Sequence, residues 1–283
     1  MRTLTTIAAM KAAVRAEKGL GKSIGFVPTM GSLHEGHLGL VRASKAKADV
    51  TVVSIFVNPR QFGPQEDLTR YPRDLEGDAA LLEKEGTDIL FVPEAAEMYP
   101  PAFRTAVEVE GLQDRLCGKS RPGHFRGVCT VVLKLFQIVR PDIAFFGQKD
   151  AQQAVILKRM AADLDLDVVL DVRPIVREAD GLALSSRNTY LSPAERKVAL
   201  VLSRSLAEAG EAIRRGERRS DRLIELLTAL IKREPAARVD YVEIVDADTL
   251  DPAPDAGAGR LIALAVYFGP TRLIDNMIVP REG

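Results

Sequence analysis

The stretch Ile24–Leu40 reads IGFVPTMGSLHEGHLGL, and its pattern shapes the expectation for the whole chain. The apolar run 24–27 predicts a short strand, Pro28–Gly31 predicts a tight turn, and a helix is expected to begin near His34–Gly36. The first N–H groups of a helix have no partner within it and lie at the positive end of its dipole, so they attract anions, phosphate above all. The stretch therefore predicts a phosphate-binding strand, turn and helix.

Two histidines, His34 and His37, stand at this predicted helix entrance with one Glu and one Gly between them. Their imidazoles can add side-chain donors aimed at the same anion. The alternative is that both are surface residues of an ordinary strand–helix unit. The glycines on both sides and the preceding strand favour the anion-binding interpretation.

The composition is that of an ordinary globular protein, with 46% hydrophobic and 28% charged residues among 283. Lys+Arg and Asp+Glu each number 39, so the formal net charge is zero. This balance argues against a general nucleic-acid-binding surface but leaves room for a local basic pocket. The length favours two domains. Cys117 and Cys129 form no CxxC pair, so neither a disulfide framework nor a zinc ribbon is expected.

The N-terminal segment is expected to be structural rather than a targeting signal. It lacks the compact apolar core and cleavage site of a secretory signal, and no apolar run in the chain approaches the length of a membrane span. Basic residues precede the first acid, Glu17, as in a mitochondrial presequence. The immediate run into strand 24–27 favours a helix carrying Ile7, Met10 and Val14 instead. A cytoplasmic protein with no membrane association is expected.

Strand and helix patterns alternate up to about residue 175. The β-branched run Asp49–Val57 is typical of a central parallel strand buried on both faces. The other expected elements are strands at 88–92, 143–146 and 167–172, a more exposed strand at 105–109, and helices at 36–48, 75–84, 128–139 and up to about 163. This alternation predicts an α/β fold with a right-handed, doubly wound parallel (Rossmann-like) sheet.

From about residue 176 the pattern changes, which predicts a boundary between a domain at 1–175 and a smaller α+β domain at 176–283. Ser192-Pro193 is expected to cap a long helix that ends near Arg215. The remaining expected elements are a helix at 221–233 and strands at 239–245, 261–268 and 273–279.

Four polar clusters fall at predicted strand ends or at the domain boundary: 28–37, 58–63, 147–153 and 184–188. The carboxyl ends of parallel strands share one edge of a sheet, where such folds place their ligands, so the clusters are expected to meet in one cleft. Three of the clusters have a plainer interpretation by themselves: a simple turn at Asn58-Pro59, a helix-start ion pair at Lys149-Asp150 and a polar linker at 184–188. The basic residues Arg121, His124 and Arg126, outside these clusters, could likewise form only a solvated basic loop.

Longer strings carry a resemblance to a known family. HEGH matches the His-x-Gly-His signature of the nucleotidyltransferase superfamily. The strings PTMGSLHEGH, SIFVNPRQF, RPGHFRGV, FFGQKDAQQ, DGLALSSRN and RLIDN, in this order along residues 1–280, closely resemble the pantothenate synthetase (pantoate–β-alanine ligase) family.

The resemblance implies a reaction in the biosynthesis of the coenzyme A precursor pantothenate. The carboxylate of (R)-pantoate would attack the α-phosphate of ATP to give pantoyl adenylate and pyrophosphate. The amine of β-alanine would then attack the adenylate and release pantothenate and AMP. Mg²⁺ would accompany the ATP, and a homodimer is expected because the family is typically dimeric. An in-line displacement at phosphorus needs mainly positioning and charge neutralisation, which polar and basic loops supply.

The resemblance also implies roles for single residues. His37, His34 and Lys149 are the implied catalytic residues, with His37 the family's proton donor and both histidines donating to phosphate oxygens. The implied ATP-binding residues are Met30, Gly31, Ser32, Leu33, His34, Glu35, Gly36, His37, Gly147, Gln148, Lys149, Asp150, Val176, Leu184, Ser185, Ser186 and Arg187.

Two glutamines, Gln61 and Gln153, would hold pantoate, and Gln61 would also lie near β-alanine. A neutral amide can bond a carboxylate without cancelling the charge of the nucleophile. Asp78 is a candidate metal ligand, and an ordinary helix-surface acid is the alternative. Arg60 and Cys117 depart from the residues that many relatives carry, so substrate contacts beside them are open.

Two other functions stay open. One is an adenylyltransferase that makes a dinucleotide, which shares the histidines but does not explain the glutamines. The other is a non-catalytic nucleotide-binding protein. A zinc hydrolase is excluded because it needs His-Glu-x-x-His.

Overall fold

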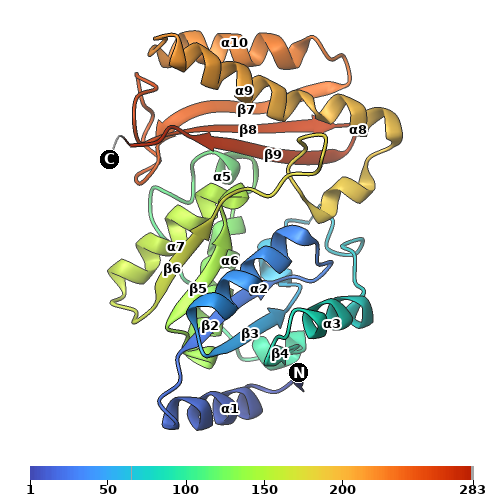
Figure 1. Ribbon diagram of the computed structural model, residues 1–283, viewed down its shortest axis with the longest axis vertical. Helices are drawn as coiled ribbons and strands as arrows, with labels where there is room; N and C mark the ends of the chain where they lie inside the picture. The colour runs from blue at the N-terminus through green and yellow to red at the C-terminus, as the bar shows by residue number, and fades with distance from the viewer. Residues whose placement is uncertain (65, 282–283) are drawn as a thin grey trace. The chain divides into compact units, whose positions relative to one another are not determined.

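The computed structural model describes residues 1–64 and 66–281 (Figure 1). The chain forms two compact units, each described here by itself. The first unit comprises Met1–Gln113, Arg121–Gly147 and Ile156–Pro174. The second unit comprises Asp114–Ser120, Gln148–Val155 and the chain from Ile175 onward. Two short segments from the first 175 residues thus belong to the second unit.

The first unit is built on a six-stranded sheet in the order β1-β4-β3-β2-β5-β6. Every neighbouring pair of strands is parallel, which confirms the predicted doubly wound α/β fold. The strands are β1 (Arg2–Leu4), β2 (Ile24–Thr29), β3 (Val50–Ile55), β4 (Ile89–Phe91), β5 (Ile143–Gly147) and β6 (Val169–Arg173). The edge strand β1 was not predicted.

Helices separate these strands along the chain. They are α1 (Ile7–Gly19), α2 (Glu35–Lys47), α3 (Leu75–Lys84), α4 (Ala95–Met98), α6 (His124–Val139) and α7 (Ala151–Asp163), with a 3₁₀ turn η1 at Pro59–Gln61. None of the helices in the described part of the chain is long and apolar enough to cross a membrane.

Both faces of the parallel sheet are covered. On one face, Phe145 of β5 packs in a buried cluster with Leu40 of α2 and Leu82 of α3. The next residue, Phe146, points to the other face, because side chains alternate along a strand, and its ring contacts Phe136 of α6 at 6.5 Å between centroids. Burying a side chain such as Phe145, which is 0% exposed, stabilises the fold by about 2–3 kcal/mol. This burial fixes the strand ends that carry the polar loops.

The predicted strand at 105–109 is wrong. This segment has no strand geometry, although Val109 is buried. The N–H of Val107 donates to the hydroxyl of Thr130 on α6 at 3.0 Å. A helix side chain thus satisfies the backbone donor that would otherwise pair in a sheet.

The second unit contains a separate antiparallel sheet, β7-β8-β9. Apolar residues of α10, among them Leu223 and Leu227, are buried in one cluster with Leu264 and Val266 of β8. The elements are α5 (Cys117–Ser120), η2 (Gln148–Asp150), η3 (Ser186–Tyr190), α8 (Pro193–Ala199), α9 (Val201–Arg214), α10 (Ser220–Lys232), β7 (Ala237–Asp246), β8 (Arg260–Phe268) and β9 (Thr271–Ile278).

The single long helix predicted after Ser192 is two helices, which are separated at Leu200. The predicted cap is confirmed. The Ser192 hydroxyl accepts from the N–H of Glu195 at 3.3 Å, and the Glu195 carboxylate accepts from the N–H of Ser192 at 2.8 Å. This reciprocal pair is a capping box, which satisfies two helix-end donors at once.

Candidate active site

Three polar loops start from one edge of the parallel sheet. Thr29 ends β2, Ile55 ends β3 and Gly147 ends β5, and these parallel strands are neighbours with β2 in the middle. The connections from β2 and from β5 lead to opposite sides of this point, which is where open α/β sheets bind their ligands.

The turn after β2 has a left-handed backbone. Gly31 has a φ of +83° and Ser32 has a φ of +53°. A Cβ on Gly31 would stand 2.9 Å from Oδ2 of Asp78 and 3.1 Å from Cγ2 of Ile55, so both the dihedral angle and the space require glycine. The turn is also tied to β3, because the Thr29 hydroxyl donates to the Ser54 carbonyl at 2.8 Å.

Helix α2 begins at Glu35, within the predicted range, and His34 is its N-cap. Nδ1 of His37 accepts from the N–H of His34 at 3.4 Å, and the two imidazole centroids lie 4.2 Å apart. A backbone N–H can only donate, so the proton of a neutral His37 ring lies on Nε2. The entrance to α2 therefore combines the helix N–H groups with an imidazole N–H donor.

Asp78 lies beneath this turn and is 4% exposed. Its Oδ2 accepts from the N–H of Ser32 at 2.8 Å and its Oδ1 accepts from the N–H of Leu33 at 2.7 Å. Burial raises the pKa of Asp78, while these two hydrogen bonds act in the opposite direction. The expectation of a helix-surface acid is wrong, because the carboxylate is buried.

The metal role predicted for Asp78, which would be shared with the ATP phosphates, stays a prediction. Both carboxylate oxygens already accept backbone hydrogen bonds. Within residues 1–64 and 66–281, no group of three or more His, Cys, Asp or Glu side chains could hold a metal ion. Among these described residues, a magnesium ion would therefore take most of its ligands from ATP and water and not from a cluster of protein side chains.

The loop after β3 presents Gln61 through a buried asparagine. Asn58 is 1% exposed; its Nδ2 donates to the Gly127 carbonyl at 3.1 Å, and its Oδ1 accepts from the N–H of Arg60 at 3.3 Å. These main-chain partners identify the oxygen end and the nitrogen end of the Asn58 side-chain amide. Nδ2 also donates to Oε1 of Gln61 at 2.9 Å, and Oδ1 accepts from the Tyr99 hydroxyl at 2.9 Å.

The orientation of Gln61 follows from that of Asn58. Because Oε1 of Gln61 is engaged, its amide nitrogen is directed to the other side, where Nε2 donates to the sulfur of Met30 at 3.2 Å. The loop after β3 thus meets the loop after β2 and offers an N–H donor there. Asn58 and Tyr99 were given no role at this site by the sequence, although a polar residue directly after a buried strand is a signal for one.

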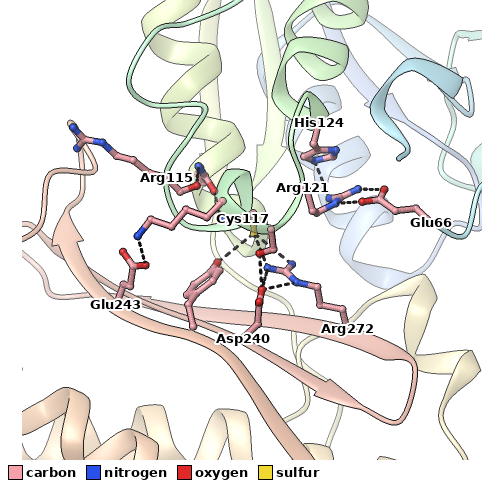
Figure 2. A network of polar contacts seen from close by, with 12 residues as sticks. Glu66, Arg115, Cys117, Arg121, His124, Asp240, Glu243 and Arg272 are labelled. Carbon is pink, nitrogen blue, oxygen red and sulfur yellow. Dashed lines mark hydrogen bonds and ion pairs between the residues drawn. The ribbon is translucent and has the colours of Figure 1, made fainter. Parts of the chain in front are cut away.

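The loop around Arg121 and His124, for which a solvated basic loop was the alternative interpretation, holds the Gln61 carbonyl. Figure 2 shows His124, Arg121 and Glu66 of this network. Nδ1 of His124 lies 2.8 Å from this carbonyl, so Nδ1 carries the proton, and Nε2 accepts from Arg121 at 3.0 Å. Arg121 in turn forms a two-pronged pair with Glu66, with both N···O distances 2.7 Å. Although burial alone would raise the pKa of Glu66, the bond from Arg121 lowers it. This loop is a rigid support for Gln61.

Arg60, which departs from many relatives, is exposed and packs its guanidinium over Tyr99 and Phe103, 5.3 and 5.2 Å from their ring centroids. Burial raises the pKa of Tyr99 to about 12, so its hydroxyl stays protonated at neutral pH and can donate to Asn58.

In the second unit, Asn276 supports the turn that carries Gln148 and Lys149. It is 5% exposed, and its Nδ2 donates to the Gln148 carbonyl at 2.9 Å and to the Lys149 carbonyl at 3.0 Å. Asp150 is exposed, and Gln153 is half-buried near the start of α7. Sequence reasoning gave Asn276 no role, although two adjacent polar residues, Asp275 and Asn276, interrupt an apolar strand and mark the place.

The segment that carries Leu184–Arg187 is folded rather than a plain linker. The N–H of Leu184 donates to the Val176 carbonyl at 3.0 Å, and Arg177 pairs with Ala183 across an antiparallel bridge. The base of this loop is held by Asp275, whose carboxylate accepts from both Nη atoms of Arg177 at 2.7 and 2.9 Å.

Cys117, the other departure, lies in a polar cluster of the second unit (Figure 2). Its sulfur is 3.2 Å from the Tyr241 hydroxyl and 3.5 Å from both Nη atoms of Arg272, which also pairs with Asp240 at 2.7 Å. Burial raises the pKa of Tyr241 well above its ordinary value. The cluster anchors α5 to β7 and β9.

The structure thus brings the clusters 28–37 and 58–63 together through Gln61 and Met30. That the clusters 147–153 and 184–188 join them in one cleft stays a prediction.

Comparison with known proteins covers almost the whole chain. A sequence model of the family described as pantoate-beta-alanine ligase matches residues 2–278. The chain is 58% identical over 279 residues to the pantothenate synthetase of Pelotomaculum thermopropionicum, covering 99% of each chain. It is 56% identical over 279 residues to that of Acetivibrio thermocellus, also with 99% of each chain covered.

Solved structures agree. A pantothenate synthetase from Thermus thermophilus is 48% identical and superposes with a TM-score of 0.95, covering 99% of this chain and 100% of that one. A pantoate-beta-alanine ligase from Francisella tularensis, described as complexed with beta-gamma ATP and beta-alanine, is 33% identical with a TM-score of 0.79, covering 98% and 97%. The chain therefore belongs to the pantoate-beta-alanine ligase family.

Proposed function

We propose that the chain joins (R)-pantoate to β-alanine at the expense of ATP, through pantoyl adenylate, and releases pantothenate, AMP and pyrophosphate. The observation that carries this proposal is the fixed amide of Gln61. Its N–H donor is presented 3.2 Å from Met30, at the turn that leads into the phosphate-binding helix entrance. An amide donor beside an anion-binding helix start suits a carboxylic acid that attacks a phosphate.

The phosphate half of the site is the entrance to α2. The helix N–H groups at Glu35 and Gly36 and the Nε2–H of His37 would meet phosphate oxygens, with His34 beside them. These donors are preorganised, so they stabilise charge that develops on the leaving pyrophosphate without first being reoriented. His37 would act mainly by this charge stabilisation.

The acid half of the site uses neutral amides. Gln61 would bind pantoate through Nε2, and Gln153 of α7 would be the second pantoate ligand. A neutral donor orients the carboxylate but leaves its charge free for attack on phosphorus. After adenylate formation the β-alanine amine would approach near Gln61 and displace AMP.

The nucleotide half draws on the second unit. Lys149 would contact phosphate and Asp150 would accept from ribose hydroxyls, on the turn that Asn276 supports. Val176 would contact adenine, and Leu184–Arg187 would contact the terminal phosphates. Magnesium would enter with the ATP phosphates, and no step depends on a protein ligand for it.

An isotope experiment tests the reaction. With pantoate labelled by ¹⁸O in its carboxylate, the attacking oxygen stays on phosphorus, so one labelled oxygen appears in AMP when β-alanine is added. Unlabelled AMP, or no AMP that depends on β-alanine, refutes the proposal. Dinucleotide formation from a phosphorylated partner identifies an adenylyltransferase, and ATP binding without turnover identifies a non-catalytic binder.

We also propose that the chain forms a homodimer in the cytoplasm. The only support for this proposal is that members of the family are typically cytoplasmic dimers. Sedimentation of the purified chain at a mass other than twice 30.9 kDa refutes the dimer. Fluorescence microscopy of a tagged chain checks the compartment.

A further inference from the structure

We propose that Asp78 is a positioning residue for ATP: its carboxylate holds the backbone of the turn 30–33 in the shape that aims the start of α2 at phosphate. This inference rests on the proposed function, because it assigns a task at the same phosphate site. It is an alternative to the metal role that the sequence suggested for this acid.

The turn needs an anchor because its backbone is unfavourable by itself. Gly31 and Ser32 are consecutive residues with left-handed φ values of +83° and +53°. For Ser32, which carries a Cβ, this conformation is unfavourable because the Cβ crowds the following carbonyl oxygen. The Asp78 carboxylate offsets this cost, because it accepts from the N–H of Ser32 at 2.8 Å and from the N–H of Leu33 at 2.7 Å.

The same contacts determine where a phosphate can bind. Consecutive N–H groups in a turn of this kind form a concavity that attracts an anion. In this protein a built-in anion, Asp78, occupies that concavity. An incoming phosphate therefore meets the helix entrance beyond Leu33, where His34 caps α2.

The position cannot relax easily around a different side chain. Asp78 is 4% exposed and lies on α3, which packs against the sheet through Leu82. Its Oδ2 is also the atom that a Cβ on Gly31 would approach to 2.9 Å. The turn, the acid and the glycine therefore fit one another as a set.

Asp78→Asn tests this with an isosteric change. The asparagine oxygen accepts from only one of the two N–H groups, and its amide donors face the other, so one side of the turn is released. Losing a hydrogen bond to a charged acceptor predicts that the Kd for ATP rises by about 10- to 100-fold. Isothermal titration calorimetry measures this affinity without turnover.

Metal dependence separates positioning from metal ligation. Because no metal contact is involved, the loss of ATP affinity should be the same with Mg²⁺ and with EDTA. A loss that is present only with Mg²⁺, or is restored by raising Mg²⁺, overturns the proposal in favour of a metal ligand. An unchanged Kd for ATP in both buffers also overturns it.

Asp74→Asn is the matched control on the same helix. Asp74 is exposed and caps α3 by accepting from the N–H of Gly77 at 3.0 Å. Asparagine is an equally favourable N-cap, so this variant should keep both the melting temperature and the Kd for ATP close to those of the wild-type chain. If it weakens ATP as much as Asp78→Asn does, general damage to α3 explains both and the proposal fails.

A second variant covers the case in which Asp78→Asn does not fold. Gly31→Ala pushes a methyl group against the Asp78 carboxylate from the side of the turn, so it should raise the Kd for ATP by a similar factor in EDTA. A wild-type Kd for this variant refutes the proposal. These are binding measurements, so they stand even if the wild-type chain makes no labelled AMP. Failure of the reaction and failure of the anchor are therefore distinguishable.

Discussion

Replacing Gln61 by glutamate reverses the polarity of the group that we propose to face pantoate while keeping its shape. In the wild-type chain Oε1 accepts from Asn58 at 2.9 Å and Nε2 is the donor on the other side. In Gln61→Glu one oxygen still accepts from Asn58, but the other presents a negative charge to pantoate. The variant should therefore bind the carboxylate far more weakly than Gln61→Ala does.

The magnitude has two parts. Losing the hydrogen bond to a charged carboxylate costs about 1.5–3 kcal/mol, and this is the part of the pantoate interaction that Gln61→Ala removes. The glutamate adds repulsion between two carboxylates about 4 Å apart, roughly 4 kcal/mol at an effective dielectric constant of about 20. Since 1.4 kcal/mol is about tenfold, kcat/KM for pantoate should fall about 10- to 150-fold in Gln61→Ala and about 10⁴- to 10⁵-fold in Gln61→Glu, where both costs apply.

The assay varies pantoate at saturating ATP and β-alanine and follows AMP. A carboxyl beside another carboxylate has a raised pKa, so the gap between the two variants should narrow as the assay is taken from about pH 8 to about pH 6. If Gln61→Glu and Gln61→Ala lose the same activity at neutral pH, the Gln61 amide does not face an anion and the assignment is wrong.

Three further predictions concern other contacts. His37→Ala should slow adenylate formation about 100-fold or more, the scale of about 3 kcal/mol for one preorganised donor, and rapid-quench measurement of pyrophosphate checks it; a near wild-type rate contradicts the role. Asn276→Ala leaves two half-buried carbonyls of the turn 148–150 without their donor and should lower the free energy of unfolding by about 1–2 kcal/mol, measured by circular dichroism because the chain has no tryptophan. Glu66 has a lowered pKa beside Arg121, so its stabilising contribution is present above its ordinary value of 4.5 and is lost as the pH falls through the folded value. In urea unfolding, the free energy of unfolding should therefore fall less between pH 7 and pH 3 for Glu66→Gln than for the wild-type chain. Equal decreases in the two proteins would contradict the pairing.

Much of the fold follows from local pattern. The run at Val50–Ile55 is buried at all six positions, and such a strand has few alternatives to the centre of a parallel sheet. The edge strand Arg2–Leu4 was missed because three residues are too few to show a hydrophobic alternation. Only their pairing with Ile89–Phe91 makes them a strand. The break at Leu200 was missed for a related reason. No Gly or Pro marks it, and Leu200 itself has helical dihedral angles.

The site was predictable only where its residues are contiguous. The strand, turn and helix around His34 could be inferred because the helix entrance is encoded locally. Asn58 and Asp78 could not, since their partners are main-chain groups of distant segments, and spacing does not encode a distant carbonyl or N–H. The hydrogen bonds of Asp78 to the N–H groups of Ser32 and Leu33 could likewise be found only from the structure.

The second unit is assembled from segments that lie far apart in the sequence, and this constrains how the protein can be made. Cys117 and Lys119 bind Tyr241 and Glu243, each 124 residues later in the chain. During synthesis, α5 therefore cannot form these contacts until β7 has left the ribosome. A gene split at residue 175, or a chimera that exchanges the two parts there, would deprive Arg272 of the Cys117 sulfur whichever half is kept. A fragment of this enzyme should be cut to keep 114–120 with its late partners, not at the point where the sequence pattern changes.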